Sequence, residues 1–215
     1  MDIIIVYTDI SKSFCTLEKY LQFISKERQE KILRFRFDKD KIISLFAELL
    51  IRQEVSKQLE IPYSGVSFGY SEYGKPYLLN DTSYHFSISH SGNCIAFVGG
   101  NFPVGIDVEQ ISSGNLKIAK RLFTINECDF IEKNEEPNTA FYRIWTSKEA
   151  YVKMLGLGLL KPFQSFDVLN DLHDCRFVTK RLPEFMLTVC LENVQAAITD
   201  VTVVDPNQLL ITETL

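Results

Sequence analysis

Alternating apolar and polar positions predict several short strands in the first half of the chain. Apolar side chains at every second position are typical of a strand with one buried face. Segments with this pattern, or with a short continuous apolar run, lie at residues 3–7, 66–70, 84–88, 94–98 and 104–109. Between the first two strands we expect a charged surface helix over residues 25–35, then a longer helix capped by Asp38 or Asp40.

Helical periodicity opens the second half of the chain, and further strands follow it. Thr124 and Glu127 have the spacing of a capping box, and Gly156 is a typical helix end. Helices are expected at residues 116–123, directly after Thr124 and at 139–155, and strands at 165–169, 185–191 and 196–203. The two-residue period favours antiparallel pairing. We interpret the chain as α+β, with two similar-sized subdomains, residues 1–104 and 105–215, joined without a flexible linker.

Composition and charge exclude several classes of protein. The 215 residues carry a net charge of −5, which argues against a general nucleic-acid binder. No apolar run approaches the roughly 18 residues that a membrane span needs, and the first apolar run is too short for a signal peptide. The cysteines are odd in number and contain no C-x-x-C pair, so we expect reduced thiols in a cytoplasmic protein. They are Cys15, Cys94, Cys128, Cys175 and Cys190.

An acidic strand is the first candidate for chemistry. In Gly105-Ile106-Asp107-Val108-Glu109 the two carboxylates point to one face, about 6–7 Å apart along the strand, on a side that Gly105 leaves open. Two like charges at this spacing raise each other's pKa unless a cation neutralises them, and a hard divalent cation such as Mg²⁺ would do so. The alternative is an edge strand whose acids face solvent.

An aromatic-rich helix carries a second pair of charges. Glu149 and Lys153 stand at i and i+4 and therefore share one helix face. They form either a helix-stabilising ion pair or a functional pair, in which Glu149 is a metal ligand or base and Lys153 clamps a phosphate.

A serine-histidine turn and a lysine loop add candidates for phosphate binding. Ser89 and His90 stand where a strand ends, a place suited to holding a phosphate. As neighbours on a strand they point to opposite faces, which argues against a serine-hydrolase pair. Lys75 and Pro76 lie in a Gly-Lys-Pro loop, where proline would stiffen the backbone beside a fixed cation. An ordinary turn with a partly exposed histidine or a solvated lysine remains the alternative at both places.

Taken in order, four segments resemble the 4′-phosphopantetheinyl transferases, specifically the surfactin-activator type with two subdomains. The segments are Gly74-Lys75-Pro76, then residues 86–92, then the G-I-D-x-E strand at 105–109 and the W-x-x-K-E-x₃-K helix at 145–153. The resemblance spans most of the chain and is weakest from residue 168 onward. It implies two α/β subdomains related by a pseudo-twofold axis, with coenzyme A bound in the cleft between them.

The resemblance also implies roles for particular residues. Asp107, Glu109 and Glu149 correspond to the ligands of Mg²⁺, for which Mn²⁺ is a substitute. The phosphate contacts correspond to Lys75, Ser89, His90 and Lys153, with Pro76 beside them. The 3′-phosphate and adenine end corresponds to Arg28, Lys31 and Ser44, where the family more often has lysine and threonine at the first and last of these positions. Glu127 matches an acidic family position with a catalytic role, and its capping-box interpretation stays equally open.

The implied reaction attacks the β-phosphate of coenzyme A with a serine hydroxyl of an acyl or peptidyl carrier protein and releases adenosine 3′,5′-bisphosphate. We expect Glu149, directly or through a water molecule, to take the serine proton, while Lys153 and His90 stabilise the growing charge. Residues 116–123 hold three cations among apolar side chains and are the candidate carrier-docking helix, or an ordinary amphipathic helix. A monomer is expected. The alternatives are a non-catalytic carrier-binding homologue and a metal-dependent phosphohydrolase.

Overall fold

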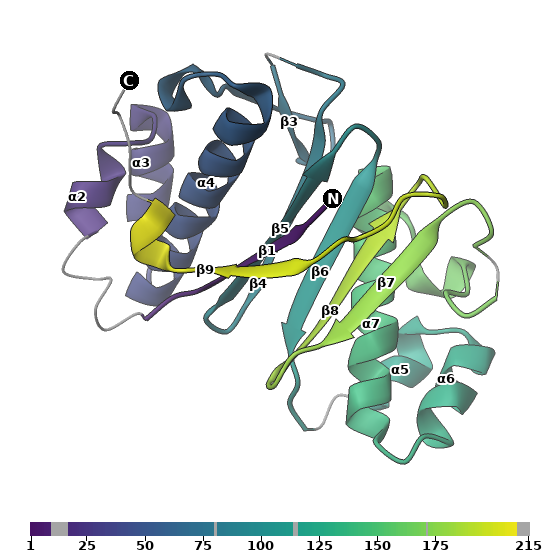
Figure 1. Ribbon diagram of the computed structural model, residues 1–215. Helices are drawn as coiled ribbons and strands as arrows, with labels where there is room; N and C mark the ends of the chain where they lie inside the picture. Colours follow the sequence, from purple (N-terminus) through teal and green to yellow (C-terminus); the bar gives the residue numbers. More distant parts are fainter. Residues whose placement is uncertain (10–16, 80, 114–115, 171, 210–215) are drawn as a thin grey trace.

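Two β-sheets form the interior of the protein and helices cover their outer faces (Figure 1). The structure is a computed structural model that describes residues 1–9, 17–79, 81–113, 116–170 and 172–209. The mixture of helices with largely antiparallel sheets confirms the α+β fold class. A pseudo-twofold relation between the two halves stays a prediction.

A four-stranded sheet with the order β4-β5-β1-β9 belongs mainly to the N-terminal half. A two-stranded hairpin, β2-β3, lies beside it. The strands are β1 (Ile3–Tyr7), β2 (Phe68–Tyr70), β3 (Pro76–Leu78), β4 (His85–Ser91) and β5 (Cys94–Gly100). The helices are α2 (Leu17–Leu21), α3 (Lys26–Leu33) and α4 (Asp38–Leu59).

A three-stranded sheet with the order β6-β8-β7 forms the C-terminal half. Its strands are β6 (Val104–Gln110), β7 (Arg176–Arg181) and β8 (Phe185–Leu191). The helices are α5 (Leu116–Leu122), α6 (Ile125–Glu132) and α7 (Pro137–Leu155), and β9 (Val201–Val204) returns to the first sheet. Four short 3₁₀ turns complete the described elements, at Tyr63–Gly65, Gly158–Leu160, Phe163–Ser165 and Pro206–Leu209.

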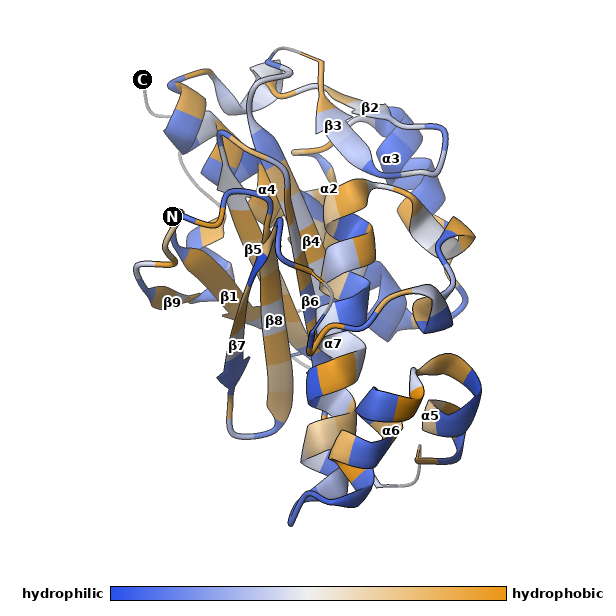
Figure 2. Ribbon diagram, turned by 90° about the vertical axis from the view of Figure 1, so that its right-hand side faces the viewer, coloured by the Kyte–Doolittle hydropathy of each residue, from blue (hydrophilic) through white to orange (hydrophobic). Residues whose placement is uncertain are grey.

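Alternate residues of β5 enter different cores, which explains why this strand is apolar throughout. Ile95 and Phe97 pack against α4, whereas Ala96 and Val98 pack in the core between the two sheets. The inter-sheet core also takes Val104, Ile106 and Val108 of β6 and Phe185, Leu187, Val189 and Leu191 of β8. Figure 2 shows the hydrophobic colouring concentrated on these strands. The apolar side chains that the two sheets share in this core hold the sheets together.

The edge strands β4 and β6 lie side by side, and serine side chains join them. Ser87 Oγ accepts the backbone N–H of Ile106 at 3.1 Å, and Ser89 Oγ donates to Asp107 Oδ1 at 2.8 Å. Residue numbers rise together along the two strands, so the strands run in the same direction. Side chains therefore join the two halves here, and two of the predicted site residues, Ser89 and Asp107, take part.

Two predicted strands are wrong in position or existence. Residues 165–169 form a 3₁₀ turn and loop, and of residues 196–203 only the end belongs to a strand, β9. β9 pairs with β1 in parallel, against the antiparallel expectation. The boundary between residues 104 and 105 stays a prediction, but this pairing returns the end of the C-terminal half to the N-terminal sheet.

Helix ends follow the sequence in most places. The capping box of Thr124 and Glu127 is confirmed, and α7 ends at Gly156 with φ 71°. Neither Asp38 nor Asp40 caps α4, since Phe37 occupies the N-cap and both aspartates lie in the first turn. There they still face the positive end of the helix dipole.

Four cysteines are free thiols, as predicted, and Cys15 lies outside the described residues. Among the described helices, we find none with both the length and the apolar character needed to cross a bilayer.

Candidate active site

Two carboxylates, Asp107 and Glu109, lie on the face of β6 that points away from the inter-sheet core. Val104, Ile106 and Val108 occupy the opposite face and are fully buried in that core. The two-residue period of the strand therefore puts both acids on one side. Asp107 is buried and Glu109 half-buried, so this is not the solvent-facing pair of an ordinary edge strand.

Helix α7 packs directly on β6 at Gly105. The expectation that Gly105 leaves this face open is wrong, because a Cβ atom there would collide with the backbone carbonyl of Ala150. Glycine is required at this position to let the helix backbone approach the strand. The close approach brings Glu149 and Lys153 of α7 alongside Asp107.

Lys153 and Asp107 form the central ion pair of the site. Lys153 Nζ donates to Asp107 Oδ1 at 2.6 Å and to Ser89 Oγ at 2.8 Å. In the described part of the chain Lys153 pairs with Asp107 and not with Glu149, so the i, i+4 ion pair is absent there. Burial raises the pKa of Asp107, and Lys153 and Ser89 oppose the rise.

The second oxygen of Asp107 has no partner in the described part of the chain. Oδ2 is buried and, among the residues that the structure describes, nothing donates a hydrogen bond to it. An unsatisfied buried carboxylate oxygen costs free energy that a cation or a donor would recover. The site is thus built to accept one more positively charged or hydrogen-bonding group.

Glu109 and Glu149 complete a group of three carboxylates. Ser91 Oγ donates to Glu109 Oε2 at 2.7 Å. Burial raises the pKa of Glu109; the bond from Ser91 opposes the rise, and the charge of Asp107 adds to it. The pKa of Glu149 is raised by burial first and then by the charge of Asp107, with Lys153 acting against the rise. Mutual repulsion of this kind is relieved when a cation binds.

A divalent metal fits this donor set. The described residues contain no ready-made group of three or more His, Cys, Asp or Glu side chains that closes around a metal. Mg²⁺ is usually held by one or two carboxylates, with substrate phosphates and water completing the shell. Asp107, with its unpartnered buried oxygen, and Glu109 meet that requirement, and Glu149 lies within electrostatic reach of both.

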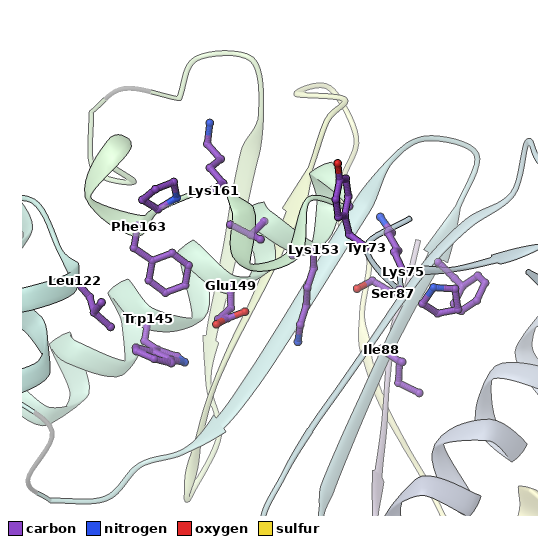
Figure 3. Close-up of a pocket in the computed structure, with 17 residues that line it drawn as sticks. Tyr73, Lys75, Ser87, Ile88, Leu122, Trp145, Glu149, Lys153, Lys161 and Phe163 are labelled. Atoms are coloured by element: carbon purple, nitrogen blue, oxygen red, sulfur yellow. The ribbon is translucent and has the colours of Figure 1, made fainter. Parts of the chain in front are cut away.

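A cavity of about 530 Å³ opens beside these carboxylates. Figure 3 shows Glu149 and Lys153 projecting into it from α7, with Lys75 across from them. Glu149 is the one acidic residue among its described lining residues. The rest of the wall is largely apolar and comes from Tyr73, Pro76, Phe86, Ile88, Leu122, Trp145, Val152, Pro162 and Phe163. The cavity can hold an apolar chain whose charged end meets Lys75, Glu149 and Lys153.

Lys75 spans the junction between the hairpin and the C-terminal half. Its Nζ donates to the backbone carbonyl oxygens of Met154, at 3.0 Å, and Val104, at 3.3 Å. Burial lowers the pKa of Lys75 to about 8. The following Pro76 begins β3, where it needs no N–H partner at the sheet edge. The structure therefore brings Lys75 to the cavity, as expected for a phosphate contact.

His90 lies on the face of β4 opposite Ser89, so the two side chains do not form a nucleophile pair. Loss of surrounding water lowers the pKa of His90, the ammonium of Lys153 lowers it further, and the carboxylates of Asp40 and Asp107 oppose this. The charges of Asp40, at the start of α4, and of the Lys153–Asp107 pair therefore both act on the imidazole.

Arg28, Lys31 and Ser44 gather away from the carboxylates, at the α3–α4 pair. Arg28 Nη2 donates to Ser44 Oγ at 3.0 Å. A second cavity of about 580 Å³ is lined by both Arg28 and Lys31. Lys31 Nζ lies 5.7 Å from the centre of the Tyr70 ring, in cation–π range. Two of the three predicted nucleotide-end residues, Arg28 and Lys31, thus line one cavity, distinct from the first, and Ser44 is hydrogen-bonded to Arg28.

Glu48 pairs with both Arg28 and Arg52, and sequence reasoning missed Glu48 and Arg52. Glu48 Oε2 lies 3.3 Å from Arg28 Nε, and Glu48 Oε1 accepts from Arg52 Nε at 2.9 Å. Arg52 Nη1 also donates to the carbonyl oxygen of Val66 at 2.8 Å. Their i, i+4 spacing inside the otherwise apolar part of α4 is a signal that could have identified them.

Glu127 is not brought to the cavity. Its carboxylate is fully buried and pairs with Lys148 at 2.9 Å, also fully buried. One oxygen accepts the N–H of Thr124 and the other that of Val168, each at 2.9 Å. These contacts support the helix-cap interpretation and give no support to a catalytic role. Lys148, the lysine of the W-x-x-K-E motif, was missed as the partner because sequence spacing does not connect it to Glu127.

Comparison with known proteins finds two family models that together match most of the chain. A model of the 4′-phosphopantetheinyl transferase superfamily matches residues 103–199, and a model of the 4′-phosphopantetheinyl transferase N-terminal domain matches residues 11–101. The 4′-phosphopantetheinyl transferase Sfp of Bacillus subtilis (strain 168) is 36% identical over 181 residues, which cover 83% of this chain and 80% of the relative.

Other relatives carry the same activity in their names. The 4′-phosphopantetheinyl transferase gsp of Aneurinibacillus migulanus is 39% identical over 145 residues, which cover 66% of this chain and 60% of the relative. The L-aminoadipate-semialdehyde dehydrogenase-phosphopantetheinyl transferase of Homo sapiens is 32% identical over 152 residues, 63% of this chain and 49% of the relative.

Proposed function

Because this chain belongs to the 4′-phosphopantetheinyl transferase superfamily, we propose that the cavity beside α7 is where it transfers the 4′-phosphopantetheine arm of coenzyme A to a serine of a carrier protein. One observation carries the assignment of the site. Glu149 lines the cavity together with Lys75 and Lys153, and Asp107, which pairs with Lys153, has a buried carboxylate oxygen that lacks a partner among the described residues. A pyrophosphate with its divalent cation would satisfy all of these charges.

The proposed metal ligands are Asp107, Glu109 and Glu149, with Mg²⁺ as the metal and Mn²⁺ as a substitute. When bound, the cation supplies positive charge that stabilises the negative charge growing on the pyrophosphate oxygens. Lys75 and Lys153 line the cavity and are the proposed clamps on those oxygens. His90 and Ser89 are the proposed further contacts.

Glu149 is the proposed general base, because it is the carboxylate that lines the cavity in the described structure. The carrier serine oxygen attacks the β-phosphate, and its proton passes to the Glu149 carboxylate, directly or through a water molecule. The bond from that phosphate to the bridging oxygen breaks, and adenosine 3′,5′-bisphosphate leaves. Glu149 and Lys153 stand one helical turn apart, so proton acceptance and charge stabilisation come from a single rigid element.

The nucleotide end of coenzyme A is proposed to reach the second cavity, where Arg28 and Lys31 offer two cations and the hydroxyl of Ser44 accepts a hydrogen bond from Arg28. The buried Glu48 pairs with Arg28, and Arg52 in turn pairs with Glu48. A phosphate monoester would be recognised by the guanidinium of Arg28 and the point charge of Lys31.

The carrier protein is proposed to dock on α5. Leu122 belongs both to this helix and to the cavity wall, so a partner on α5 stands beside the reaction. Exposed Leu116 and Ile118 provide apolar contacts, and Lys117 and Arg121 provide cations for an acidic partner. We further propose a cytoplasmic monomer that acts without nucleic acid or membrane, since both walls of the cavity come from one chain.

Mass spectrometry of the carrier tests the function directly. The purified chain is mixed with coenzyme A, Mg²⁺ and an apo carrier protein, and the carrier should gain the mass of one phosphopantetheine arm. Release of adenosine 3′,5′-bisphosphate without carrier modification would support a phosphohydrolase instead. No reaction would support a carrier-binding homologue without activity.

A further inference from the structure

Three serines at alternate positions of β4 cross to β6, and each makes a different set of contacts. Ser87 Oγ accepts the N–H of Ile106, and Ser91 Oγ accepts the N–H of Gln110, both at 3.1 Å. These backbone groups belong to an edge strand that no neighbouring strand pairs on this side. The serine hydroxyls therefore accept backbone N–H groups that the carbonyls of an adjacent strand would otherwise accept. Ser87 and Ser91 do this in the same way.

Only one of these two serines also touches a carboxylate in the described structure. Ser91 Oγ donates to Glu109 Oε2 at 2.7 Å, whereas Ser87 makes no such bond. Ser91 therefore connects the backbone of β6 to the side chain of Glu109 through a single hydroxyl, accepting from one and donating to the other. This arrangement fixes one carboxylate oxygen and determines where the other points.

We propose that Ser91 is the positioning residue for Glu109 as a ligand of the divalent cation. A carboxylate that turns freely about its side-chain bonds loses conformational freedom when it binds a metal, and a hydroxyl that already holds it reduces that loss. This inference rests on the proposed metal site and deepens it, since the family resemblance assigned roles to Ser89 and His90 but none to Ser91.

Ser89 does not fill the same role for Asp107. Its hydroxyl donates to Asp107 Oδ1, but Lys153 Nζ donates to that same oxygen and to Ser89 Oγ. Asp107 is thus held by two groups and Glu109 by Ser91 and the indole of Trp145. After removal of the Ser91 hydroxyl, Glu109 keeps the neutral N–H of Trp145, whereas after removal of the Ser89 hydroxyl Asp107 keeps the charged Lys153. Charge-assisted hydrogen bonds are stronger, so loss of the Ser91 hydroxyl should change metal affinity more than loss of the Ser89 hydroxyl.

The test measures binding of Mn²⁺ alone to the full chain, by the loss of the free-ion electron paramagnetic resonance signal. Ser91→Ala should raise the dissociation constant about tenfold, in the range typical of lost contacts behind metal ligands. Ser91→Thr retains a hydroxyl and suits a strand, so it should bind Mn²⁺ like the unmodified chain. Ser87→Ala is the matched control, because it loses the same kind of serine-to-backbone bond and no bond to a carboxylate.

A purely structural role for Ser91 predicts a different result. In that case Ser87→Ala and Ser91→Ala would lower the melting temperature and change Mn²⁺ affinity by equal factors, and the proposal would be overturned. It would also be overturned if Ser91→Ala bound Mn²⁺ normally. If the unmodified chain failed to bind Mn²⁺, the metal site itself would be wrong, an outcome that the unmodified sample separates from a failure of Ser91 alone.

Discussion

Helix α7 carries two lysines, Lys148 and Lys153, each paired with a carboxylate of another element. The two pairs differ in how many of their polar atoms have hydrogen-bond partners. Lys148 and Glu127 have side chains with 0% exposure. Lys148 Nζ also donates to the carbonyl oxygens of Phe163 and Phe166, each at 2.6 Å, and lies 4.2 Å from the centre of the Phe166 ring. Both Glu127 oxygens accept backbone N–H groups. This pair is complete without any ligand.

The pair of Lys153 and Asp107 is incomplete. Lys153 is 31% exposed at the cavity while Asp107 is 4% exposed, and Asp107 Oδ2 has no hydrogen-bond partner in the described part of the chain. The comparison shows how one helix serves two purposes. The fully buried pair of Lys148 and Glu127 fastens α7 to α6 and to the loop before residue 168. The pair of Lys153 and Asp107 keeps an oxygen without a partner among the described residues, and we propose that substrate and metal bind there.

Loss of the pair of Lys148 and Glu127 should have the largest effect on stability. Lys148→Met leaves the Glu127 carboxylate buried without its cation, which should lower the free energy of unfolding by about 3–5 kcal/mol. Urea denaturation followed by circular dichroism measures this. Lys133→Met is the control, because its ion pair with Asp129 on α6 is exposed and should contribute little. Undiminished stability with lost transfer would instead connect Lys148 to the chemistry.

Removal of the proposed base should affect turnover without affecting stability. Glu149→Gln keeps the shape of the side chain but cannot accept a proton, so the transfer rate should fall about 10²–10⁴-fold. Coenzyme A affinity, measured by calorimetry on the same sample, should remain close to that of the unmodified chain. Turnover at the unmodified rate would remove Glu149 from the base role.

Lys75 should produce a smaller effect that depends on pH. Its pKa is lowered to about 8 by burial, so it is charged below that pH and becomes neutral as the pH rises through it. The value of kcat/KM for coenzyme A should therefore fall as the pH rises through about 8, since the free enzyme loses a phosphate-binding cation.

The matching variant is Lys75→Gln, which lacks the titrating group. At neutral pH it should lower kcat/KM roughly tenfold, as for one charge-assisted hydrogen bond, and the fall near pH 8 should disappear. A fall that persists unchanged in Lys75→Gln would assign it to another group.

The sequence predicts individual strands and helix ends well, because the residue pattern that forms each of them lies within a short stretch of the chain. Period-two patterning identified β6 and the shared face of Asp107 and Glu109, and the Thr124–Glu127 spacing identified a helix start. The same spacing could not decide between a cap and a catalytic acid. That decision depends on Lys148, whose approach to Glu127 is set by the packing of α6 on α7 and leaves no trace in sequence separation.

Long-range pairing was the main source of error. β9 crosses back to lie parallel to β1, and its register is decided by partners nearly 200 residues away. The role of Gly105 was likewise misread, because the space beside it is filled by α7 and not by solvent. The proposed role of Ser91 in positioning Glu109 depends on the edge strands β4 and β6 lying side by side. No periodic pattern in the sequence predicts that these two strands are neighbours.

The most direct test compares the two carboxylates under identical conditions, by measuring unfolding free energy and transfer rate for Asp107→Asn and Glu127→Gln. Asp107→Asn leaves Lys153, which is 31% exposed and stays hydrated at the cavity, so this variant should retain stability and lose transfer about 10²–10³-fold. Glu127→Gln should lose stability and, at a temperature where it is folded, transfer the arm at close to the unmodified rate. Stable but inactive Glu127→Gln together with unstable but active Asp107→Asn would contradict this account.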